Sequence, residues 1–168
     1  MIRRLRFSFL LVLFPAISIS AQQPVNYPKL TGYFSVVNPI GSWNSHGFTS
    51  NFGEVYTIGF PFGLNILKSD RFGVSFEVAP SIRTENHISK VNSVLFHPGA
   101  MFRFKHGFTF IGRLAFETNG RFGVTPVLNK IIRKGKESSF FASVPFPVRL
   151  GNDLPTSVST GLQLGVAF

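Results

Sequence analysis

The residues able to do chemistry are few, and one pair stands at a spacing that suits a hydrolase. His87 and Ser89 lie two positions apart in a polar stretch. In hydrolases an imidazole can take the proton of a serine hydroxyl, which then attacks as the nucleophile. That base is usually oriented by a carboxylate, and no Asp or Glu occurs over residues 91–115. Glu85 and Glu117 remain candidates for the orienting role, but we expect the pair to be inactive.

A second group of residues has charges that need partners. Glu77 and Arg113 fall on the small and polar sides of their segments, about equally far from the neighbouring turns, with Gly99 on the segment between them. A charge held inside a protein must be paired or hydrated. We therefore predict an interior ion pair between Glu77 and Arg113, direct or through water, with Arg103 as the alternative partner.

The other titratable residues indicate no cofactor and no metal. His46, His97 and His106 are dispersed and lack the spacing of metal ligands. The formal net charge is +10, and a basic chain can bind nucleic acid when its cations cluster on one face. Here they are scattered, so we predict no nucleic-acid partner.

The first 21 residues have the pattern of an export signal. Arg3, Arg4 and Arg6 precede an apolar run that ends at Ala21, before Gln22. A positive start, an apolar run of about a dozen residues and a small residue at the cut describe a cleaved signal peptide. The run is shorter than the roughly 20 residues that a spanning helix needs. We predict cleavage between Ala21 and Gln22, which leaves residues 22–168 as one domain.

The composition of the chain favours a strand-rich unit. Of 168 residues, 21 are Phe and 14% are charged, against about a quarter in ordinary soluble domains. The 16 Gly and 11 Pro residues are spread along the chain, which disfavours long helices. These numbers exclude a disordered chain and a coiled coil.

The apolar residues alternate with a period of two over most of the chain, which predicts β-strands. In the clearest case Phe72, Val74, Phe76 and Val78 alternate with Gly73, Ser75, Glu77 and Ala79. The pattern predicts eight strands over residues 30–37, 53–67, 72–83, 93–104, 108–117, 122–128, 140–150 and 162–168. Turns near residues 68–71, 105–107 and 133–137 alternate with connections near 38–52, 84–92, 117–121 and 151–157.

The composition of the face opposite the Phe residues distinguishes a membrane barrel from a soluble one. A soluble lipocalin-like barrel also has about eight strands, but its outer face is rich in charge. Here the face opposite the Phe residues is mostly small and polar, with too few charges for a solvated exterior. We therefore predict an all-β, closed, antiparallel up-and-down transmembrane β-barrel with its Phe-rich face toward lipid. Trp43, Tyr33 and Tyr56 are predicted at the membrane interfaces. The predicted periplasmic rim consists of Lys68, Arg71, Lys105, Arg133, Lys134 and Lys136.

Prolines within the predicted strands are the main objection to that fold. They are Pro61, Pro80, Pro98, Pro126, Pro145 and Pro147. Proline removes a donor from the strand ladder. We expect either a belt of β-bulges at similar heights or strands that end at their prolines and make a shorter barrel.

In its alternation and its C-terminus the chain resembles the small eight-stranded outer-membrane barrels typified by outer-membrane protein X and the barrel of outer-membrane protein A. Phe168 is preceded at alternate positions by Val166 and Leu164. In that family a terminal aromatic with this alternation is read by the barrel-assembly machinery, which the resemblance implies as a partner. His87 and Ser89 also resemble the His-x-Ser element of outer-membrane lipid A deacylases, but Lys90 stands where that family has Asn.

These observations favour a monomeric protein of a Gram-negative outer membrane, in contact with its lipids. The expected role is structural or adhesive, because eight strands leave no open pore. Two alternatives stay open. One is a lipid-modifying enzyme like the lipid A deacylases, and the other is a periplasmic lipocalin-like binder.

Overall fold

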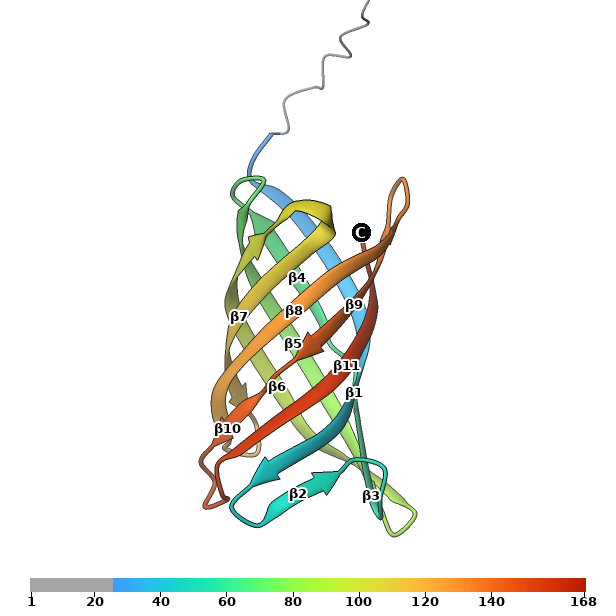
Figure 1. The fold of residues 1–168 in the computed structure, drawn as a ribbon, viewed down its shortest axis with the longest axis vertical. Coiled ribbons are helices and arrows are strands. Elements are labelled where there is room, and N and C mark those ends of the chain that lie inside the picture. The colour runs from blue at the N-terminus through green and yellow to red at the C-terminus, as the bar shows by residue number, and fades with distance from the viewer. Residues whose placement is uncertain (1–25) are drawn as a thin grey trace, which may run out of the picture.

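The computed structural model describes residues 26–168, and it consists almost wholly of β-strands (Figure 1). The predicted signal peptide and its Ala21–Gln22 cleavage site lie outside the described residues. The strands are β1 (Lys29–Asn44), β2 (Gly47–Ser50), β3 (Val55–Gly59), β4 (Phe62–Leu67), β5 (Phe72–Glu85), β6 (Ile88–Arg103), β7 (Phe108–Glu117), β8 (Phe122–Lys134), β9 (Ser139–Pro145), β10 (Val148–Leu150) and β11 (Ser157–Ala167). One 3₁₀ turn, η1 (Lys105–Gly107), joins β6 to β7.

The strands form one antiparallel up-and-down sheet that curls into a barrel-like shape. Neighbours in sequence pair in order from β3 and β4 through β5, β6, β7 and β8 to β9. β11 then pairs with β1 over a register that runs from Tyr33 opposite Ala167 to Trp43 opposite Val158. If β3 and β4 are taken as one strand, β9 and β10 as another, and β2 as the outer arm of a hairpin, the sheet has the eight strands that the alternation predicts. We call them the spanning strands, because each runs from one end of the barrel to the other (Figure 1).

The two faces of the sheet differ as the alternation predicts. Large apolar side chains point outward on every spanning strand, for example Phe34, Phe62, Phe76, Phe96, Phe110, Leu128, Phe140 and Leu162. Inward positions carry the buried polar residues Ser35, Ser75, Glu77, His97, Arg113, Thr125, Ser143, Arg149 and Gln163. The period of two of an extended chain is the cause, because successive side chains point to opposite faces.

The two ends of the barrel also differ. The chain enters at Lys29 and leaves at Phe168 at the end where β4–β5, β6–β7 and β8–β9 are joined (Figure 1). At the opposite end the β1–β2 and β5–β6 hairpins extend beyond the ring. We call these the short-turn end and the hairpin end.

Two connections predicted as loops are strand instead. The predicted loop over residues 84–92 is wrong, because β5 and β6 continue to a two-residue turn at Asn86 and His87. Both turn residues have positive φ angles, of 50° and 63°, which is typical of tight hairpin turns that match the strand twist. The connection over residues 38–52 is likewise shorter than predicted, because β1 runs on to Asn44 and pairs back with β2.

The structure shows strand breaks at two of the prolines in the predicted strands and register shifts elsewhere in the sheet. The second spanning strand is interrupted at Phe60–Pro61, and the seventh at Phe146–Pro147. β1 shifts register beside Pro39. The β5–β6 pairing shifts between Ser81 and Ile82, where Asn92 of β6 is the extra residue. Other prolines stay inside paired strands, as Pro98 does opposite Phe76. The prolines therefore do not form a uniform belt of β-bulges. Some lie at strand breaks, and others lie within regularly paired strands.

Within residues 26–168 there is no helix long and apolar enough to cross a membrane.

Neighbouring strands approach each other closely at Gly99. A Cβ there would stand 2.3 Å from the backbone oxygen of Gly112 and 2.7 Å from Cγ of Arg113. We expect Gly99→Ala to destabilise the barrel by about 1–3 kcal/mol, because a well-packed site has no room for the methyl group. Urea unfolding of refolded protein measures the change.

Gly112→Ala is the matched control on the adjacent strand, since its Cβ would meet only Phe110 at 3.9 Å. Its effect should stay within about 0.5 kcal/mol. Equal stability of the two variants would contradict the close approach of β6 and β7.

Candidate functional site

The centre of the barrel holds a buried ion pair between β5 and β7. Glu77 Oε2 lies 3.2 Å from Arg113 Nη1, and the two side chains are 4% and 3% exposed. Arg113 Nη2 also donates to Tyr33 Oη at 2.9 Å and to Ser75 Oγ at 3.1 Å. The hydroxyl of Tyr33 donates in turn to Glu77 Oε2 at 2.7 Å. Side chains from β1, β5 and β7 thus hold this pair of charges in place.

His97 extends the network to a second ion pair. Its Nδ1 lies 2.9 Å from Glu77 Oε1, and its Nε2 lies 2.9 Å from Thr125 Oγ1. Arg149 Nη1 donates to the same Thr125 hydroxyl at 2.9 Å, and Arg149 Nε contacts Glu117 Oε1 at 2.6 Å. A neutral imidazole with its proton on Nδ1 satisfies each of these bonds, because Thr125 then donates to Nε2. The network contains two arginines and two glutamates and is balanced in charge.

The strand register and two glycines place these residues together. Glu77 stands opposite His97 on β6 and opposite Gly63 on β4. Gly99 stands between Ser75 and Arg113 in the same ladder. A Cβ at Gly63 would lie 2.6 Å from Tyr33 Oη. Because glycine has no Cβ, the Tyr33 hydroxyl can reach the carboxylate of Glu77.

The sequence-predicted pair is in direct contact, but other members of the network were not predicted. Arg103, the alternative partner, makes no ion pair within the described part of the chain. The assignment of Tyr33 to the membrane interface is wrong, because Tyr33 points inward and is 6% exposed. In sequence, His97 is one of three dispersed histidines. Its inward position opposite Glu77 in a long hairpin is the signal that identifies it.

The structure does not bring His87 and Ser89 into hydrogen-bonding contact. His87 sits in the tight turn with a positive φ angle, and Ser89 Oγ pairs with Thr84 Oγ1 at 2.9 Å across the hairpin. Both candidate orienting carboxylates bind arginines. Glu85 lies 3.1 Å from Arg83, and Glu117 belongs to the interior network.

The residues of the predicted assembly signal lie on β11 and just after it. Leu164 and Phe168 are exposed on the outside, and Val166 is half-buried. The backbone of Phe168 exchanges two hydrogen bonds with Gly32, at 2.8 and 2.9 Å. The last residue thereby continues the pairing of β11 with β1.

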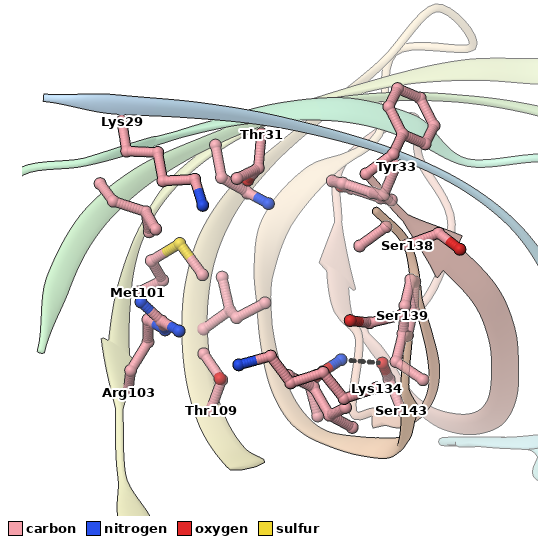
Figure 2. A pocket seen from close by; sticks show the side chains of 18 of the residues that line it. Lys29, Thr31, Tyr33, Met101, Arg103, Thr109, Lys134, Ser138, Ser139 and Ser143 are labelled. Carbon is pink, nitrogen blue, oxygen red and sulfur yellow. Dashed lines mark hydrogen bonds between the residues drawn. The ribbon is translucent and has the colours of Figure 1, made fainter. Parts of the chain in front are cut away.

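Between the network and the short-turn end, a cavity of about 430 Å³ occupies this half of the lumen (Figure 2). Its wall includes a cluster of buried apolar side chains, Leu67, Met101, Ile111 and Val127. Arg113 Nε and Asn65 Oδ1 are buried without hydrogen-bond partners within residues 26–168, and both residues line this cavity.

Charged residues surround the open end of the cavity. Lys29, Arg103 and Lys134 direct their ends toward the same open space in Figure 2. The Tyr27 hydroxyl donates to the carboxylate of Asp70, and this bond raises the pKa of the Tyr27 phenol above its usual value. Over residues 26–168, no group of three or more His, Cys, Asp or Glu side chains is arranged to hold a metal ion.

The interior ion pair should matter far more than an exposed one. Glu77→Gln leaves Arg113 buried without a charged partner, and such a loss costs about 3–5 kcal/mol. Glu85→Gln, in a pair whose side chains are 46% and 52% exposed, should cost about 1 kcal/mol or less. Unfolding titrations in lipid vesicles measure both changes.

The double variant Glu77→Gln, Arg113→Gln tests whether the cost of Glu77→Gln comes from the charge left on Arg113. Part of the lost stability should return, because the uncompensated charge is gone. A cost for Glu77→Gln as small as that for Glu85→Gln would contradict a structural role for the network.

Comparison with known proteins yields structural neighbours only. No protein-family model matches the chain, and no curated protein sequence matches it. A designed transmembrane β-barrel is similar at 9% identity and a TM-score of 0.49, over 85% of this chain and 97% of that one. The solution NMR structure of the designed barrel TMB2.3 shares 13% identity and has a TM-score of 0.46, over 84% and 94% of the two chains.

A natural protein is also among the neighbours. The outer-membrane protein OprG of Pseudomonas aeruginosa is 10% identical, with a TM-score of 0.43 over 82% of this chain and 92% of that one. The likeness to outer-membrane protein X and outer-membrane protein A stays a resemblance. The fold assignment rests on the strand pairing of the chain itself, which is all-β, antiparallel, up-and-down and barrel-like.

Proposed function

We propose that this protein is an integral outer-membrane β-barrel with a structural or adhesive role and no open pore. The observation that carries the proposal is the exposed apolar surface that surrounds the barrel. Soluble monomers rarely expose contiguous apolar patches larger than a few hundred Å², whereas lipid-facing strands alternate apolar-out and polar-in. Here every spanning strand carries large, exposed apolar side chains on its outward face.

The short-turn end supports an orientation in the membrane. The cations of the predicted rim, from Lys68 in the first turn to Lys136 in the last, are all exposed there. Short turns face the periplasm in bacterial barrels, so we place this end in the periplasm and the hairpin end outside the cell.

The interior network supports the absence of a pore. Arg113, Glu77, His97, Thr125 and Arg149 are bonded side chain to side chain across the lumen. Eight-stranded barrels have interiors just wide enough for side chains to fill. An ion would need to displace these buried bonds to cross.

The hairpin end supports a role in contact with other molecules. Trp43 on β1 and Phe48 on β2 pack with ring centroids 4.8 Å apart, and both are exposed. Exposed aromatic side chains are enriched at protein interfaces. We propose a monomeric barrel that relies on the barrel-assembly machinery for insertion and contacts other surfaces through these hairpins.

Cell fractionation and heat treatment test the membrane assignment. The protein should sediment with the outer membrane and migrate faster on gels when unheated, because a folded barrel resists unfolding. Phe76→Arg should lower the stability of the inserted barrel by about 2–4 kcal/mol, as arginine does at the bilayer midplane.

Phe104→Arg is the matched control at the short-turn rim, with an expected cost of about 1 kcal/mol or less. Recovery of the protein in the soluble periplasmic fraction would favour the lipocalin-like alternative. Equal costs at the two positions would show that the outward face does not meet lipid.

We also propose that the barrel has no deacylase activity. The geometry at the β5–β6 turn supports this, because Ser89 pairs with Thr84, Glu85 pairs with Arg83 and Glu117 pairs with Arg149. A serine nucleophile needs a base within hydrogen-bond reach and a group that orients the base.

Lipid A extracted from cells that express the protein should therefore be the same for the wild type, Ser89→Ala and His87→Ala. Mass spectrometry of the lipid gives the answer. Loss of an acyl chain with the wild type, abolished by either substitution, would establish the enzyme instead.

A further inference from the structure

We propose that the cavity in the short-turn half of the lumen binds a single-chain anionic amphiphile, with its chain inside and its anionic group at the mouth. This binding activity goes beyond the structural or adhesive role. Cavities of roughly 300–1,000 Å³ serve small-molecule binding, and this one has about 430 Å³. An eight-stranded barrel can hold one small ligand.

The first argument is the apolar wall. The middle of the lumen is polar, whereas one part of the cavity wall consists of Leu67, Met101, Ile111 and Val127, each 7% exposed or less. Polar residues such as Thr31, Thr109 and Asn129 line the rest of the cavity. Apolar side chains in a barrel interior gain nothing from water, and an apolar group placed against them is removed from water as well. An alkyl chain is the ligand that fits this surface.

The second argument is the charge at the mouth. Lys29, Arg103, Lys134 and Lys136 line the cavity there, and none takes part in a side-chain ion pair within residues 26–168. The acidic residues of the lining are Asp70 and Glu137. Asp70 already accepts the Tyr27 hydroxyl. The cations outnumber the acids, so the mouth favours an anionic head over a cationic one.

The third argument is the closed inner end. Arg113 lines the cavity, and its charge is balanced by Glu77 at 3.2 Å. An inserted chain therefore ends against a charge-balanced network, beside Arg113 Nε and Asn65 Oδ1, which have no hydrogen-bond partner within residues 26–168. It enters from the short-turn side. The geometry gives one direction of entry, with the anionic head left among the lysines.

Met101 provides a reporter inside the cavity, because the chain has only two methionines and the other is Met1. The barrel is refolded into nanodiscs of phosphatidylcholine with ¹³C-methyl methionine and titrated with decanoate below its micelle concentration. We expect a saturable shift of the Met101 methyl signal. Decanol, which has the same chain without a charge, should bind more weakly.

Two charge-reversal variants locate the head. Lys29→Glu with Lys134→Glu should weaken decanoate binding about tenfold, which corresponds to about 1.4 kcal/mol. Lys68→Glu with Lys105→Glu changes two exposed lysines of the same rim that do not line the cavity, and it should change the affinity less than about twofold. All variants share the same bilayer, so uptake of decanoate by lipid cancels.

Thr31→Trp adds a test of the chain position, because Thr31 lines the cavity at a half-buried site. It should abolish the Met101 shift while heat-modifiable migration is kept. The proposal is overturned if decanoate gives no saturable shift, if decanol binds as tightly as decanoate, or if both pairs of charge reversals weaken binding equally.

Discussion

The pairing of charge inside the lumen is the constraint on which the rest of the barrel depends. Arg113 and Glu77 are almost wholly removed from solvent, and each would be costly to bury alone. Their contact requires β5 and β7 to stand at one fixed register on either side of β6. A shift of one residue in any of these strands would turn the side chains to the outer face. A wrong strand register therefore costs more free energy with this ion pair in the lumen than it would if apolar side chains filled the lumen.

The same constraint explains the small residues of the interior. Gly63 leaves room for Tyr33 to reach Glu77, and Gly99 lies between Ser75 and Arg113. These glycines thus leave space beside the long inward side chains of Tyr33 and Arg113. Long polar side chains next to glycines thus fill the middle of the lumen. The cavity begins closer to the short-turn end, where Met101 and Ile111 take the inward positions.

Much of the fold follows from the sequence, because strand alternation is a local property. The eight strands, the outward Phe residues and the contact of Glu77 with Arg113 can all be predicted from the period of two. The position of Tyr33 cannot, since an aromatic side chain suits both a membrane interface and an interior. Nor can His97, whose role appears only when the long β5–β6 hairpin sets it opposite Glu77. The polar composition of residues 84–92 hides that hairpin, because exposed strand ends and loops use the same residue types.

The interior side chains also account for how a barrel tolerates prolines at its strand breaks. Where the second spanning strand is interrupted, Ser35 supplies both its backbone N–H and its hydroxyl to the carbonyl of Pro61, at 2.8 and 3.0 Å. Gln163 donates to the same hydroxyl at 2.8 Å. Beside the break at Phe146–Pro147, Arg149 Nη1 donates to the carbonyls of Val124 and Val148 at 3.2 and 3.1 Å. Buried backbone groups must find hydrogen-bond partners within the protein. Inward polar side chains supply donors beside both breaks, so the residues that fill the lumen also satisfy the backbone where the strand ladder is interrupted.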